Sequence, residues 1–97
     1  MLETDLQKKC LEWCKKNNIV AYNQHENGFT GKGVPDVLLC INGKFVACEL
    51  KVGKGGLSPA QKIRKKQIER AGGLHFVPRT LNQFIEIIKG VKNNDKS

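Results

Sequence analysis

Apolar residues near the start of the chain recur at the spacing of an α-helix. Within residues 2–17 they fall on one face while the lysines lie mostly on the others, and the apolar set is Leu6, Cys10, Trp13 and Cys14. Two later segments carry the capping-box pattern, Ser58-Pro59-Ala60-Gln61 and Thr80-Leu81-Asn82-Gln83. The sequence therefore predicts helices over about 2–17, from 59 to about 70 or 71, and from about 81 onward, with residues 93–97 frayed.

Between these helices the pattern changes to short, β-rich runs. The run IVAYNQH (19–25) precedes a glycine-rich loop over 26–33. Two longer apolar runs are then joined by Asn42-Gly43, which is a strong signal for a two-residue β-hairpin turn. A second glycine-rich loop follows Lys51, and LHFVP (74–78) predicts a last strand.

The predicted order is α-β-β-β-α-β-α, which favours an α/β three-layer sandwich in a single domain over residues 1–97. Both faces of the hairpin are apolar, so we expect helices on both sides of the sheet.

Composition points toward a polyanionic partner. The chain has 17 Lys and Arg against 9 Asp and Glu, a net charge of +8. Such an excess is typical of nucleic-acid binding, although lysines that merely solvate the surface are the alternative. No apolar run is long enough to cross a membrane and no secretion signal is present, so we expect a cytoplasmic protein of a bacterial or phage-infected cell.

The four cysteines favour reduced thiols packed in the core. They form no CxxC pair. In the hairpin register set by Asn42-Gly43, Cys40 and Cys48 face opposite sides of the sheet, so the four thiols cannot converge on zinc.

Two carboxylates stand out in the otherwise apolar hairpin. The same register places Asp36 opposite Glu49 in a non-hydrogen-bonded pair, with Lys51 on the same face as Glu49. At roughly 5 Å and an effective dielectric of about 20, two such charges repel by about 3 kcal/mol. Either Lys51 alone compensates them, or they bind a divalent cation such as Mg²⁺ or Mn²⁺ together with a backbone carbonyl such as that of Leu50.

These residues resemble a known nuclease signature. Pro35-Asp36, followed thirteen positions later by Glu49-Leu50-Lys51, is similar to the PD-(D/E)xK motif. Gly33-Val34-Pro35-Asp36, the E-x-K and Leu57-Ser58-Pro59-Ala60-Gln61 together resemble the VRR-NUC (virus-type replication-repair nuclease) family, over most of the chain from about Glu3. The resemblance implies a restriction-endonuclease-like core with a central mixed sheet.

The resemblance also implies roles for individual residues. Asp36, Glu49, the Leu50 carbonyl and an acid on the first helix, best matched by Glu3, would bind the metal. Lys51 would stabilise transition-state charge or orient the attacking water. Gln61 would belong to the active site, and the residues expected to contact DNA are Lys32, Lys54, Lys62 and Lys65.

Alternatives stay open for two of these residues. If Thr4 caps the first helix, then Glu3 lies in solvent just outside it, and Glu12 is a competing acid on the more polar face. Gln61 is also fully explained as the capping-box partner of Ser58.

The predicted function is a Mg²⁺-dependent DNA endonuclease. Resemblance to Holliday-junction resolvases implies a homodimer that cuts four-way or other branched DNA. A basic DNA-binding module of the same fold without catalysis is the alternative.

Overall fold

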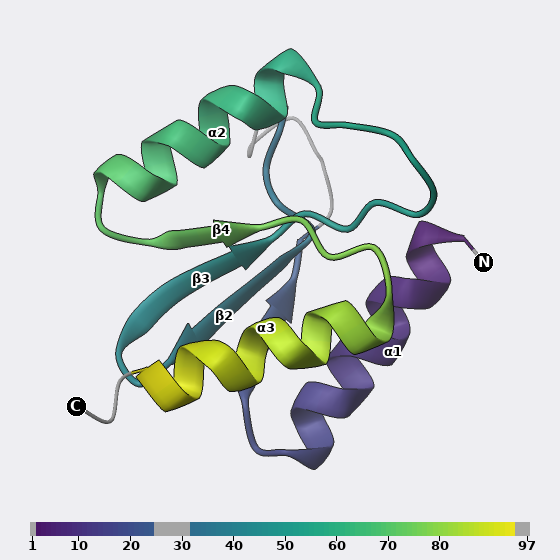
Figure 1. Cartoon of the computed structure of the whole chain (residues 1–97), viewed down its shortest axis with the longest axis vertical. Coiled ribbons are helices and arrows are strands. Elements are labelled where there is room, and N and C mark those ends of the chain that lie inside the picture. Colours follow the sequence, from purple (N-terminus) through teal and green to yellow (C-terminus); the bar gives the residue numbers. More distant parts are fainter. Residues whose placement is uncertain (1, 25–31, 95–97) are drawn as a thin grey trace.

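The order of helices and strands agrees with the sequence prediction. The computed structural model describes residues 2–24 and 32–94. Within these ranges the elements follow one another as shown in Figure 1: α1 (Glu3–Lys16), β1 (Val20–Asn23), β2 (Val37–Ile41), β3 (Lys44–Cys48), α2 (Pro59–Arg70), β4 (Leu74–Phe76) and α3 (Leu81–Asn94).

The end of the last helix and the first glycine-rich loop lie at the margins of the described ranges. Fraying from residue 93 is wrong for Asn93 and Asn94, which still belong to α3, whereas 95–97 lie outside the described residues. The first predicted glycine-rich loop, 26–33, also lies outside them except for its last two positions.

The strands form a mixed sheet in the order β1-β2-β3-β4. The first three are antiparallel neighbours, and β4 runs parallel to β3. Ile41 pairs with Lys44 and Val37 with Cys48, which is the predicted register. Asn42 and Gly43 have φ values of 52° and 81°, as a type I′ turn requires.

The main core lies between the sheet and the pair α1 and α3. These two helices contact each other on one side of the sheet. Their buried residues meet the inward residues of β2 and β3 in a single cluster: Leu6, Cys10, Cys14, Val37, Leu39, Ile41, Val46, Cys48, Leu50, Phe84, Ile88 and Val91. Burial of this apolar surface is the main force that holds the layers together.

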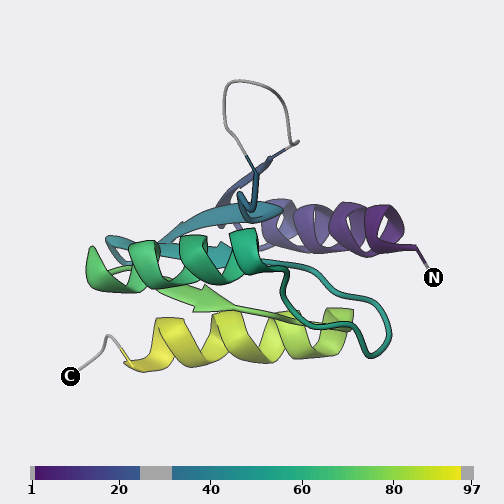
Figure 2. The same cartoon turned by 90° about the horizontal axis from the view of Figure 1, so that it is seen from above.

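Helix α2 lies on the opposite side of the sheet, and Figure 2 looks onto this side. Ser58 caps it as predicted, because its Oγ accepts a hydrogen bond from the Gln61 backbone N–H at 3.2 Å. However, no residue of α2 is fully buried, and α2 contacts mainly β4. The expectation of a sheet covered on both sides therefore holds over β4 and the end of β3 at Ala47, but not over β1, β2 and Phe45 of β3.

The cysteines follow the predicted register but not all of the predicted packing. Cys10, Cys14 and Cys48 are buried and carry no disulfide, and burial raises the pKa of Cys10 to about 12 and of Cys14 to about 11. Cys40 is exposed, so the prediction of a core position is wrong for this residue. It lies on the face of the sheet that α2 leaves open.

Candidate active site

Asp36 and Glu49 lie directly beyond the last paired residues of β2 and β3. The Asp36 carbonyl accepts hydrogen bonds on the β1 side, from the Gln24 N–H at 2.8 Å, and from Gln7 Nε2 at 3.0 Å. The Glu49 N–H donates to the Phe76 carbonyl on the β4 side at 2.9 Å. The backbone groups of Asp36 and Glu49 thus form hydrogen bonds to their outer neighbours and not to each other. This is the pattern of the predicted non-hydrogen-bonded pair.

The Asp36 side chain is fixed by the backbone beyond β3. Its Oδ2 accepts a hydrogen bond from the Leu50 N–H at 2.8 Å. A carboxylate that receives a hydrogen bond from a backbone N–H is held in one orientation.

Glu49 is held in a less favourable setting. It is 4% exposed, and its Oε1 has no hydrogen-bond partner among the described residues. Burial raises the pKa of Glu49 to about 9, and a hydrogen bond to Asp36 together with the negative charges of Asp36 and Glu3 acts in the same direction. Lys51 opposes this rise. A buried acceptor without a partner is costly, which favours either a proton or a cation at this oxygen.

The two acids open into a cavity of about 300 Å³ between the sheet and the start of α2. Its lining comes from the residue after β1, the segment before β2, the residue after β3 and the N-terminus of α2. These residues are Gln24, Lys32, Gly33, Val34, Asp36, Glu49, Ser58, Pro59, Ala60 and Gln61. The structure therefore brings together Asp36, Glu49, Lys32 and Gln61, which the sequence had singled out.

Gly33 explains how the α2 N-terminus comes so close to the acids. Gly33 has φ +80°, and a Cβ at this position would lie 2.5 Å from the Ala60 carbonyl carbon and oxygen. Only glycine allows both this backbone conformation and this approach.

Lys51 and Glu3 reach the acid pair without lining the cavity. The backbone N–H of Lys51 donates a hydrogen bond to the Pro78 carbonyl at 3.3 Å. The positive charge of the Lys51 side chain lowers the pKa of Glu49. Glu3 is the first residue of α1 and borders a hollow with Leu2, Thr4 and Val52. The alternative in which Thr4 caps the helix is wrong, because Leu2 is the N-cap.

The competing acid on α1 lies elsewhere. Glu12 is exposed and borders a separate hollow with Asp5, Lys8 and Lys9. A metal-ligand role for Glu3 stays a prediction.

Gln61 combines both roles that the sequence left open. Its Oε1 accepts a hydrogen bond from the Ser58 N–H at 2.8 Å, so the capping box is formed. The side chain also lines the cavity, and with the oxygen engaged by the cap, the amide nitrogen is the end that can donate to a bound group.

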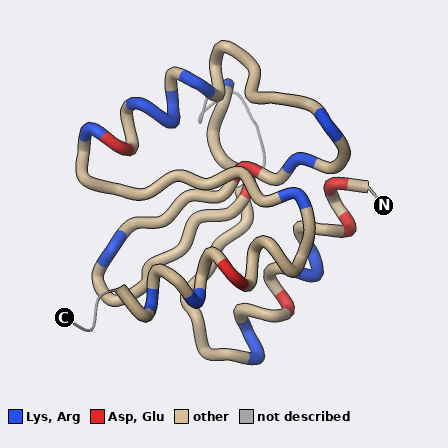
Figure 3. Tube along the Cα trace, viewed as in Figure 1, with Lys and Arg blue, Asp and Glu red and all other residues tan. Residues whose placement is uncertain are grey.

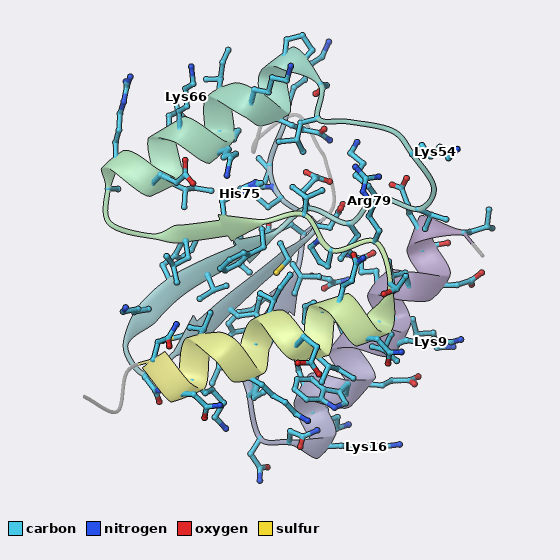
Figure 4. All side chains as sticks on the ribbon, in the orientation of Figure 1. Lys9, Lys16, Lys54, Lys66, His75 and Arg79 are labelled. Carbon is cyan, nitrogen blue, oxygen red and sulfur yellow. The ribbon has the colours of Figure 1, made fainter. Side chains whose placement is uncertain are left out.

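The basic residues expected at DNA divide into two groups. Lys32 lines the cavity, Lys62 is exposed on α2, and Lys54 is exposed on the loop before α2, where Figure 4 shows it pointing away from the sheet. Lys65 instead pairs with Glu69 within α2 at 3.0 Å. Figure 3 shows that Lys and Arg residues follow one another along α2.

Four supporting residues were missed by sequence reasoning. Gln7 and Gln24 bond the Asp36 carbonyl. Arg64 Nε donates to the Lys32 carbonyl at 3.2 Å, and Arg79 Nη1 donates to the Gly53 carbonyl at 2.7 Å, which ties down the loop after Lys51. For Gln24 the antiparallel pairing of the first two strands could have given the signal, whereas the others depend on tertiary contacts.

The acid pair fits a hard divalent cation. Two carboxylates meet at a cavity, and one buried carboxylate oxygen lacks a partner among the described residues. Carboxylate oxygens are the ligands that Mg²⁺ and Mn²⁺ prefer. The ranges 2–24 and 32–94 contain no group of three or more His, Cys, Asp or Glu residues arranged to hold a metal.

Comparisons with known proteins support the fold assignment. No family model and no curated protein matches the sequence. Among solved structures, a protein described as "VRR_NUC domain protein" superposes with a TM-score of 0.78 at 20% identity, covering 92% of this chain and 86% of its own. Another, described as "VRR_NUC domain", gives a TM-score of 0.74 at 21% identity, covering 90% of this chain and 94% of its own.

Within the described residues no helix is long and apolar enough to span a membrane.

The element order, the mixed sheet and the two superpositions agree with one another. The chain therefore has the fold of the VRR_NUC domain proteins.

Proposed function

We propose that this protein is a nuclease that hydrolyses phosphodiester bonds in DNA with the help of Mg²⁺ or Mn²⁺. The observation that carries the proposal is the buried carboxylate of Glu49, which faces Asp36 at a cavity and leaves one oxygen without a partner among the described residues. A fold maintained for binding alone would gain nothing from two acids directed at a phosphate.

The chain's own residues supply most of the required preorganisation. The Leu50 N–H donates to the Asp36 side chain, and Gln7 and Gln24 donate to the Asp36 carbonyl. The Asp36 carboxylate is therefore already oriented, and binding a ligand costs little further conformational entropy at this residue. Asp36 and Glu49 would hold the metal, with the Leu50 carbonyl and Glu3 as further candidate ligands, and the bound metal would supply Lewis acidity to polarise the phosphoryl oxygen and lower the pKa of the attacking water.

Positive charge and hydrogen-bond donors complete the site. Lys51 lies close enough to act on the charge of Glu49, and on the substrate it stabilises the negative charge that develops on the phosphate. Lys32 on the cavity wall neutralises a neighbouring phosphate, and the Gln61 amide nitrogen donates to a phosphate oxygen or to the water.

Replacement of Asp36 by Asn tests this function. We expect cleavage to fall at least about 100-fold, the scale of losing a transition-state contact, while DNA binding persists or tightens because repulsion toward phosphate is relieved. Cleavage of labelled flap, four-way and linear DNA in Mg²⁺ and in EDTA, together with binding in EDTA, measures both. Asp5→Asn, an exposed aspartate on α1, is the matched control. Near wild-type cleavage by Asp36→Asn would remove Asp36 from the chemistry.

We further propose that the enzyme acts on branched DNA as a homodimer. A four-way junction has two-fold symmetry, so paired cuts need two sites related by a two-fold axis. Light scattering at micromolar concentration, with and without a junction, tests the assembly. A monomer in both conditions, or equal cleavage of junction and linear duplex, would leave a general metal-dependent nuclease.

A further inference from the structure

One face of the sheet is exposed and apolar beside α2. Its residues are Val20 and Tyr22 of β1, Cys40 of β2 and Phe45 of β3, and we call this set the open face. Tyr22 is 66% exposed, Val20 52% and Phe45 47%. Exposed aromatic residues on a sheet need an explanation, since burying them in the core would stabilise the fold.

The open face is continuous with the candidate active site. Gln24 follows Tyr22 by two positions and Asp36 precedes Leu38 by two, so both project from the same side of the sheet as the open face. Tyr22 pairs with Leu38, and Leu38 with Ala47. Tyr22 thus lies two residues before Gln24 and on the same side of the sheet. Gln24 lines the cavity that contains the two acids.

Helix α2 forms a positively charged border of this face. It contains five Lys or Arg residues and one Glu, and it covers Ala47 and His75 but leaves Tyr22 exposed. Arg64, through its bond to the Lys32 carbonyl, lies on the side of α2 that faces the segment leading into β2. Exposed aromatic rings next to a line of cations form the usual surface for unpaired nucleotides, whose bases stack while the phosphates meet the cations.

We propose that the open face binds single-stranded nucleotides of the DNA substrate, with Tyr22 as the residue on which a base stacks. The proposal rests on the proposed nuclease function and adds to it a site that recognises the unpaired strand next to the scissile bond. A second copy of the chain is disfavoured as the occupant. In a two-fold contact through this face the two α2 helices, each with five Lys or Arg residues against one Glu, would approach each other and repel.

Binding in EDTA tests the proposal without requiring cleavage. We expect Tyr22→Ser to weaken binding of a fluorescent single-stranded 12-mer about tenfold, within the range measured for one base stack. Tyr22→Phe keeps the ring and should bind within about twofold of wild type. Equal affinity for Tyr22→Ser and wild type, with both folded by thermal melting, would overturn the proposal.

The chain's single tyrosine provides a direct signal. With ¹³C-labelled tyrosine, the ring resonances report on Tyr22 alone, and base stacking should shift them upfield on addition of the 12-mer. An unchanged ring spectrum at saturating 12-mer would overturn the proposal. So would a dimer of wild type that Tyr22→Ser converts to a monomer, because the face would then be an interface between copies.

The two proposals can fail separately. If wild type cleaves DNA in Mg²⁺ but Tyr22 shows neither effect, the stacking site is wrong and the nuclease function stands. If Tyr22 responds to the 12-mer but no cleavage occurs in Mg²⁺ or Mn²⁺, the stacking site stands and the nuclease function is wrong.

Discussion

Glu49 is the residue whose environment departs most from that of an ordinary carboxylate. It is buried, faces Asp36, and leaves one oxygen without a partner in the described part of the chain. Burial and Asp36 both disfavour the charged form of this carboxylate. In the metal-free protein they raise the pKa of Glu49 well above its ordinary value. The same features that destabilise the free anion favour its binding to a cation.

This setting predicts how stability depends on pH in EDTA. The pKa of Glu49 is about 9 in the folded protein against an ordinary value of 4.5, so the folded state binds more protons between these values and stability falls as pH rises through that window. Glu49→Gln should lose most of this fall and should be more stable than wild type at pH 8 by roughly 1–3 kcal/mol. Denaturant unfolding in EDTA at pH 5, 7, 8 and 9 measures the effect.

The exposed Glu86→Gln on α3 serves as the matched control and should follow wild type. A Glu49→Gln protein that unfolds well before wild type at pH 8 would show instead that Glu49 is held by a structural ion pair with Lys51. Added Mg²⁺ or Mn²⁺ should stabilise wild type more than Glu49→Gln.

At the scale of elements, α2 determines the shape of the site. No residue of the helix is fully buried, so its position depends on a few contacts at its ends and beneath it. At the N-terminus, Gly33 packs against the backbone of Ala60 and Gln61. Beneath it lies His75, which is buried, and burial and the charge of Lys65 lower the pKa of its imidazole.

Gly33→Ala should therefore displace α2 and disable the site. The new Cβ would lie 2.5 Å from backbone atoms of Ala60, which cannot yield without moving the helix. We expect a loss of about 2 kcal/mol or more, combining steric overlap with an unfavourable positive φ. Denaturant midpoints and cleavage rates measure the two effects.

Gly53→Ala is the control that measures the cost of a positive φ without steric overlap. Gly53 also has positive φ, at +83°, but a Cβ there meets nothing within 4 Å. It should cost only the conformational penalty, about 1 kcal/mol, and leave cleavage intact. Equal losses for the two variants would show that the close approach of Gly33 to α2 is not important.

At the scale of the whole molecule, part of the net charge of +8 comes from positive residues around the candidate site. Positive residues follow α2 and the loops near the cavity, as Figure 3 shows, while the two acids lie at the end of the sheet. In the proposed function, such an arrangement would attract the DNA backbone from a distance and would leave the acids to act at one phosphate.

DNA affinity should accordingly depend steeply on salt. If about five phosphates are neutralised, affinity falls roughly 10²–10³-fold between 50 and 200 mM salt. Lys32→Ala, on the cavity wall, should lower the slope of log affinity against log salt by about one. Lys89→Ala, exposed on α3 in the opposite layer, should leave the slope unchanged. Identical slopes for both variants would place the DNA elsewhere on the surface.

Local signals were sufficient to predict most of the fold and part of the site. Asn42-Gly43 specified the hairpin register because only a few residues adopt the required positive φ at both turn positions, and the register in turn set Asp36 opposite Glu49. Ser58, Pro59 and Gln61 located the start of α2 to the residue, because a capping box is satisfied within four residues. Each of these features depends on contacts between near neighbours.

Only the tertiary structure decided which surfaces are covered and which side chains the acids meet. Periodicity marked both faces of the hairpin as apolar, but the placement of α2 over β3 and β4 left Tyr22 and Cys40 exposed. Likewise, Gln7 bonds the Asp36 carbonyl from a helix 29 positions away. The sequence by itself determined the elements, the hairpin register and the acid pair, because these follow from local backbone preference. The open face, the burial of the Glu49 carboxylate and the hydrogen bonds that hold Asp36 depend on how distant layers pack, which no local pattern encodes.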